Sequence, residues 1–244
     1  MNLRDSLSLS ILIHVAIGTL GLLFYWFALL SKKGSRFHRN SGRIFLIVLM
    51  GVSFSVAPVL YFRSGKIEPP FVVQMVYLVT CLCTVSFIAW SAMRWKKQPD
   101  RFRGPHFLAL GCILLALGGL VLAAGLLSGD FVAIVLSWVG LVFGPAMIAF
   151  YRERRPLHPR WWLVWHLNSV SALFNAVHGT LLYVAAVYLG IFAEGVFGKV
   201  FFQIFTIAGA VGVRLYFGIR FNIPFRFTAE AHRLNERPPS EVAS

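Results

Sequence analysis

Acidic residues are scarce in this sequence: its 244 residues include nine Asp and Glu against 23 Lys and Arg, a formal net charge of +14. The few acids all fall outside the long apolar runs of the chain. The sequence therefore excludes a catalytic pair of carboxylates, and it excludes the intramembrane carboxylate that proton-coupled carriers use. It also offers few oxygen ligands for Mg²⁺ or Ca²⁺, which argues against a metal-dependent transfer reaction.

Cysteine is scarce too, and the motifs of soluble enzymes are absent. The three cysteines, Cys81, Cys83 and Cys112, all lie in apolar runs and form no CxxC pair. This excludes a disulfide framework and favours a role as small apolar residues. The chain has no Walker loop, no GxGxxG after a strand, no HExxH and no GxSxG, which excludes the enzyme classes that these motifs mark.

Apolar sequence is abundant, since 58% of the residues are hydrophobic. Runs of about 20 residues recur, and each is long enough to cross a hydrocarbon core of ~30 Å at ~1.5 Å per residue. Strands of a membrane barrel would be shorter, about 10 residues, and alternating. The fold class predicted is all-α, a polytopic transmembrane bundle of about seven helices. The predicted spans are 8–30, 44–62, 71–93, 106–127, 131–150, 162–188 and 199–219.

Charge predicts the orientation of this bundle. Most Lys and Arg residues lie in the loops after the first, third and fifth spans and after residue 213. By the positive-inside rule these loops are cytoplasmic, with the N-terminus outside and the C-terminus inside. We expect a transmembrane domain over residues 1–220 and a partly disordered cytoplasmic tail over 221–244. The positive charge suits an anionic cytoplasmic leaflet and requires no nucleic acid.

The sixth span carries a polar stripe. Asn168, Ser171, Asn175 and His178 fall within an arc of roughly 80° on a helix. Polar groups inside a membrane usually face the bundle interior. The stripe therefore predicts a polar cavity or a docking face for a partner subunit.

Two histidines on different spans suggest a redox site. His14 lies in the first span, above Gly18 and Gly21 on the same side, and His178 lies in the sixth. Counting residues from the span ends places both in the outer half of the membrane. A pair of imidazoles at one depth is what a b-type haem needs, with Asn175 beside it, and equally what a hydrogen-bonded pair needs.

Other polar residues gather near the basic loops. His166 could pair with another histidine of that side around a second haem. A lipid head group could instead be held by His38, Arg39, Arg43, His158 and Arg160. In the last span, Gln203 and Thr206 share a face, and we expect Arg214 to extend to the cytoplasmic surface. Pro145 predicts a kink in the fifth span.

Short motifs carry one resemblance. "HVAIG" (14–18), "HRNSGRIF" (38–45) and "HPRWWLVWHLNSVSALFNAVHGTLLYV" (158–184) resemble a family of bacterial multi-pass membrane proteins without an assigned reaction. That family has a first-helix HxxxG, an HRxxGR hinge and an HxxWxxxHLxxM segment. The matching positions are His14, Gly18, His38, Arg39, Gly42, Arg43, His158, Trp162 and His166, with Val170 in place of Met. The resemblance implies a multi-pass protein of a bacterial inner (plasma) membrane.

Three functions remain open from the sequence. The first is a redox subunit that binds haem b or a quinone. The second is a non-enzymatic accessory protein or small-ligand carrier. The third is a protein that binds lipid head groups with its basic loops. No reaction is named by the sequence, so whether the protein is an enzyme stays open.

Overall fold

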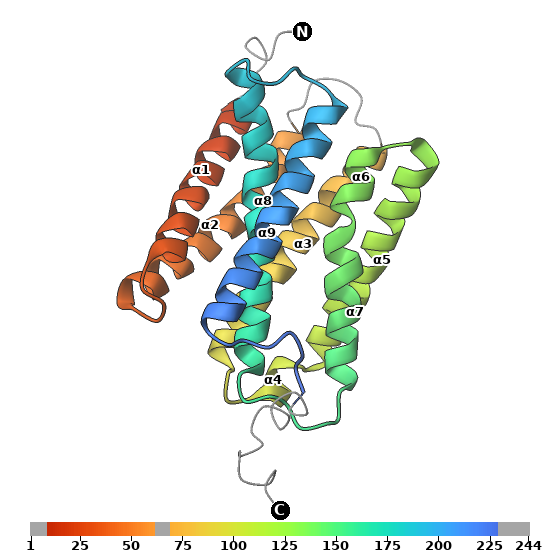
Figure 1. Cartoon of the computed structure of the whole chain (residues 1–244). Coiled ribbons are helices and arrows are strands. Elements are labelled where there is room, and N and C mark those ends of the chain that lie inside the picture. Colours follow the sequence, from red (N-terminus) through yellow and green to blue (C-terminus); the bar gives the residue numbers. More distant parts are fainter. Residues whose placement is uncertain (1–8, 62–68, 229–244) are drawn as a thin grey trace, which may run out of the picture.

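The computed structural model describes residues 9–61 and 69–228 of the chain. These residues form an all-α bundle (Figure 1), whose helices follow one another with short connections. The helices are α1 (Leu9–Leu30), α2 (Arg36–Tyr61), α3 (Pro69–Arg94), α4 (Pro99–Phe102), α5 (Pro105–Ser128), α6 (Phe131–Leu136), α7 (Trp138–Arg152), α8 (Trp161–Tyr188) and α9 (Val196–Arg220).

Seven segments are long and apolar enough to cross a membrane, which confirms the multi-pass prediction. The fifth segment is divided into α6 and α7 at Ser137, whereas α7 continues through Pro145. The division coincides with a buried side chain from α3: the Tyr77 hydroxyl accepts from the backbone N–H of Gly140 at 2.9 Å and lies 2.9 Å from the carbonyl of Ser137. The same hydroxyl lies 3.1 Å from the carbonyl of Leu136, the group that the Gly140 N–H would bond in a continuous helix, so it bridges the missing helical bond.

Small residues allow α5 and α7 to pack closely. A Cβ on Gly118 would lie 2.9 Å from the Cα of Gly140, and a Cβ on Gly111 would lie 2.9 Å from Cβ of Met147. Side chains at these positions would push the two backbones apart. In a membrane, where lipid is as apolar as the helix surface, such close backbone contact is a main source of association.

One end of the bundle carries most of the positive charge. The last turns of α1, α3, α7 and α9 meet the first turns of α2, α5 and α8 there, in the lower part of Figure 1. We call it the basic end and define it by Lys33, Arg103, Arg155, Arg160 and Arg220. It is also the end with the largest aromatic cluster.

The aromatic cluster fills the space between α4, α5, α7 and α8. Trp165 is 1% exposed and lies with its ring centroid 5.2 Å from that of Phe107 and 5.4 Å from that of Phe150. The ring of Phe227, from beyond α9, stacks on Trp165 at 4.8 Å. The cluster therefore joins five separate segments at the basic end.

Residues 221–228, which we call the strap, run from the end of α9 across the basic end (Figure 1). The backbone N–H of His158 donates to the carbonyl of Phe227 at 2.7 Å, and Leu157 forms an isolated bridge with Thr228. This first part of the predicted tail therefore packs on the bundle. The rest of that tail, and the prediction of disorder for it, lies outside the described residues.

Candidate functional site

The structure places His14 and His178 at different heights. Nδ1 of His14 lies 2.7 Å from Oγ of Ser55 on α2. His178 instead meets Trp26, whose indole N–H donates to Nε2 at 3.0 Å. His14 and Trp26 are twelve residues apart on α1, which is about 18 Å along the helix. The expectation of a common depth therefore does not hold.

The surroundings of His178 do not suit an axial ligand. Its Nδ1 lies 2.8 Å from the carbonyl of Phe174, so that nitrogen carries the proton and Nε2 accepts from Trp26. The ring of Phe174 stacks on the imidazole at 4.0 Å. Both ring nitrogens are engaged, and His14 is far away, so the two histidines do not fit a shared haem in this arrangement.

The remaining residues proposed around that haem are also dispersed. Gly21 packs on α2, where a Cβ would lie 3.3 Å from Val48, while Gly18 has no neighbour that a Cβ would meet within 4 Å. His166 directs Nδ1 to the carbonyl of Ala89 on α3 at 3.0 Å. Asn175 belongs to a separate network.

That network is the densest group of polar side chains inside the bundle. Nδ2 of Asn175 donates to Oε1 of Gln203 at 3.0 Å and to Oγ1 of Thr206 at 2.8 Å, both on α9. Oδ1 of Asn175 accepts from Nε1 of Trp138 on α7 at 3.1 Å. Nε2 of Gln203 reaches Oγ1 of Thr180 at 3.4 Å. The network ties α8 to α7 and α9.

A cavity of about 140 Å³ adjoins the network, between α3, the junction of α6 and α7, α8 and α9. Its walls are largely apolar, and its polar lining is Cys81, Trp138, Asn175, Thr180 and Gln203. From the predicted stripe only Asn175 lies in this lining. Asn168 faces Arg214 and His178 faces α1. The predicted stripe therefore does not line one cavity as a whole, because Asn175 is its one residue in this lining.

The predicted basic hinge has a structural role at the end of α1. Nδ1 of His38 bonds the carbonyl of Ala28 at 2.9 Å, and the Nζ of Lys33 donates to the same carbonyl at 3.0 Å. Nη1 of Arg39 donates to the carbonyl of Gly34, a residue with φ of 79°. Cations on the last carbonyls of a helix favour its C-terminus. Arg43 is exposed on α2.

His158 and Arg160 are bound to the strap. Nδ1 of His158 accepts from the backbone N–H of Arg160 at 3.0 Å, and Nη1 of Arg160 donates to the carbonyl of Phe221 at 2.9 Å. These two residues therefore hold the strap across the start of α8. The five residues predicted to hold a lipid head group do not converge on one point. They are divided between the α1–α2 hinge and the strap.

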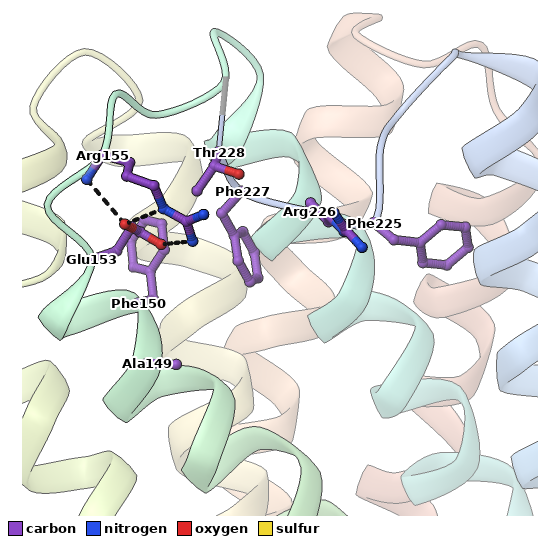
Figure 2. Close-up of a pocket in the computed structure, with 8 residues that line it drawn as sticks. All are labelled: Ala149, Phe150, Glu153, Arg155, Phe225, Arg226, Phe227 and Thr228. Carbon is purple, nitrogen blue, oxygen red and sulfur yellow. Dashed lines mark hydrogen bonds and ion pairs between the residues drawn. The ribbon is translucent and has the colours of Figure 1, made fainter. Parts of the chain in front are cut away.

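A pocket of about 300 Å³ lies between the end of α7 and the strap (Figure 2). Phe227 points into it beside Phe150, while Phe225 points away from the ion pair of Glu153 and Arg155. That pair has an N–O distance of 2.7 Å, and the hydrogen bonds from Arg155 lower the pKa of the partly buried Glu153 carboxyl to about 2. Arg155 is thus already neutralised by an acid.

Arg214 is a buried charge, although its position near the end of the last span predicts that it reaches the surface. Its side chain is 7% exposed. Nε donates to Oδ1 of Asn168 on α8, Nη2 donates to the carbonyl of Pro224 at 2.8 Å, and the ring of Phe225 covers the guanidinium at 4.3 Å. Nη1 is buried without a hydrogen-bond partner among the described residues.

The site around Arg214 is formed by two residues on neighbouring helices, Asn168 on α8 and Arg214 on α9. In the sequence, Asn168 belongs to the polar stripe and Arg214 lies close to the end of the last span, but nothing in either helix pattern shows that the two meet. The strap, which covers Arg214 from outside, reads in the sequence as part of a polar tail.

Comparisons with known proteins identify no relative of this chain. No family model matches the chain, and neither a curated protein nor a solved structure matches it. The resemblance drawn from the short motifs therefore identifies no family. The helices themselves support one conclusion: the chain is an integral, multi-pass membrane protein.

Proposed function

We propose that this membrane protein binds the phosphate group of an anionic lipid at its basic end, with Arg214 as the buried charge that receives it. The observation that carries the proposal is that Arg214 has no counter-charge among the residues that the structure describes. Arg214 is 7% exposed, and its hydrogen bonds go to a neutral amide and a backbone carbonyl. Within the described residues, the ion pairs are Arg103–Asp100 and Arg155–Glu153.

A buried guanidinium without an anion is costly, because the charge has left water and gained no opposite charge in return. Arginine is also the side chain whose planar set of donors best matches the oxygens of a phosphate. A phosphate at Nη1 would provide both the missing acceptor and the missing charge.

A glycine of the same helix makes room for Nη1 itself. A Cβ on Gly218, one turn further along α9, would collide with Nη1 of Arg214. Six residues separate Arg214 from Arg220, the last residue of α9, which is about 9 Å along the helix. This depth is suited to the junction between acyl chains and head groups.

The surrounding charge favours an anionic partner as well. Lys33, Arg160 and Arg220 lie at the same end of the bundle, which raises the local concentration of anionic lipid. By the positive-inside rule we expect this end to face the cytoplasm, with the N-terminus outside. The plasma membrane of a bacterium is the membrane that the resemblance of the short motifs suggests. The proposal thus develops the third of the functions left open by the sequence.

Native mass spectrometry of the protein with phosphatidylglycerol and with phosphatidylcholine tests the proposal. We expect the wild type to retain phosphatidylglycerol preferentially and Arg214→Gln to lose the preference. Arg214→Lys should keep part of it, because lysine keeps the charge and loses the fork of donors. Arg220→Gln is the matched control: it removes the same charge from an exposed position on the same helix, so any loss of preference there measures the general attraction of the basic end alone. Equal retention by wild type and Arg214→Gln would refute the proposal.

A further inference from the structure

We infer that the cavity beside Asn175 is a second binding site, open to the lipid, for a neutral membrane-soluble molecule with a carbonyl oxygen. It is independent of Arg214, because it lies near the other end of α8 and α9. Thr180 is eight residues from the end of α8 and Gln203 is seven from the start of α9, about 12 and 10 Å along the helices. Both therefore lie at the depth of acyl chains.

The cavity opens sideways from the bundle. Ala176 and Thr180 line it and are exposed, and α8 is a membrane-spanning segment. Side chains exposed at this depth face hydrocarbon, not water. A polar lining that faces hydrocarbon has no water to satisfy its hydrogen-bonding groups.

The polar groups of the cavity lining that are not fully hydrogen-bonded among the described residues are donors. Gln203 is 7% exposed, and its Oε1 already accepts from Asn175. Its Nε2 carries two hydrogens, and among the described residues its bond goes to Oγ1 of Thr180 at 3.4 Å, at the long limit for a hydrogen bond. The Thr180 hydroxyl accepts there and donates to no described group. Unused donors select a ligand with acceptor oxygens.

The size of the cavity further restricts which ligands can bind. A volume of about 140 Å³ holds about four water-sized groups at ~30 Å³ each. A transmembrane helix of a partner, ~10 Å across, cannot enter it. The carbonyl head of a lipid-soluble molecule can, with the apolar remainder in the bilayer. The carbonyl of a quinone ring and the ester carbonyl of a neutral glycerolipid share this chemistry.

Photolabelling in lipid nanodiscs tests the inference. The probe is a long-chain alkyl ketone with a diazirine close to its carbonyl group, compared with the same chain without the carbonyl. Peptide mass spectrometry locates the adducts. We expect the ketone, and not its hydrocarbon analogue, to label the segments around Ala176, Thr180 and Gln203.

Two variants examine the contacts separately. Thr180→Val removes a donor and keeps the shape, so labelling should fall about three- to tenfold, as expected for one hydrogen bond. Ala176→Leu narrows the opening from an exposed position and should also reduce labelling. Thr80→Val is the matched control, since the hydroxyl of Thr80, which is half-buried on α3, donates to the carbonyl of Val76 in its own helix. Labelling unchanged by Thr180→Val and Ala176→Leu would overturn the inference, as would equal labelling by the hydrocarbon analogue.

Competition identifies the natural source of the carbonyl. An alkyl quinone that suppresses labelling at these segments assigns the site to quinones, and a diacylglycerol that does so assigns it to neutral glycerolipids. Failure of both competitors to reduce specific labelling would also overturn the inference, because both present the acceptor oxygen that the lining is proposed to bind.

Discussion

Arg214 donates from Nε to the side-chain oxygen of Asn168, so the buried cation of α9 is met on α8 by a neutral amide and not by an acid. An amide orients the guanidinium without neutralising it. The charge that remains is the basis for the proposed anionic lipid.

Stability should therefore depend on lipid charge through Arg214. We expect phosphatidylglycerol to raise the unfolding temperature of the wild type and to leave that of Arg214→Gln almost unchanged. A ligand at a hundredfold excess over its Kd adds ~2.7 kcal/mol to the free energy of unfolding. Thermal unfolding in neutral detergent, with and without the lipid, measures the difference. An equal shift in both proteins would show that the lipid acts elsewhere.

The network around Asn175 should contribute to stability. Asn175→Leu removes the acceptor of Trp138 Nε1 and the donor to Gln203 and Thr206. Leaving buried polar groups without partners costs about 1–3 kcal/mol, so the variant should unfold at a lower temperature. Thr80→Val, which removes only an exposed bond within α3, should have little effect. If both variants unfold alike, the network adds nothing to stability.

Lys33 gives the protein a pH dependence in the alkaline range. Burial, and then the charge of Arg220, lower the pKa of Lys33 from 10.5 to about 8. Between these values the unfolded chain binds more protons than the folded one, so stability should rise as the pH increases from 8 to 10.5. Unfolding temperatures across this window should show the rise in the wild type and a smaller one in Lys33→Met. Lys32→Met, at an exposed neighbour, should retain it.

Absorption spectra examine the histidines. After expression with added haem, we expect the wild type, His14→Ala and His178→Ala to give the same oxidised spectrum and the same dithionite-reduced spectrum. The reason is the separation of the two imidazoles and the hydrogen bond from Trp26 to Nε2 of His178. A Soret band that sharpens on reduction and disappears in both variants would contradict this arrangement.

The seven spans could be predicted because length and hydropathy are local properties of the chain. The interruption at Ser137 could not, since it depends on Tyr77, which comes from another helix. Pro145, the local signal for a kink, lies within a continuous α7.

The candidate site was predictable only in its components. Helical periodicity correctly places Asn168 and Asn175 on one face, and places Gln203 and Thr206 on another. It does not fix how far one helix is shifted along its neighbour. That shift brings Trp26, and not His14, to His178. In the same way, a strap that covers Arg214 depends on tertiary contacts of Phe227 and Pro224, which no local pattern reports.

The most direct test of the central claim is a distance measurement between Arg214 and lipid phosphorus. Solid-state NMR of arginine-labelled protein in phosphatidylglycerol bilayers detects ¹⁵N–³¹P dipolar coupling. We expect strong coupling to a guanidinium signal that is absent from Arg214→Gln and present in Arg220→Gln. Coupling that is identical in the wild type and in Arg214→Gln would show that no lipid phosphate lies at Arg214, and would contradict the proposed function.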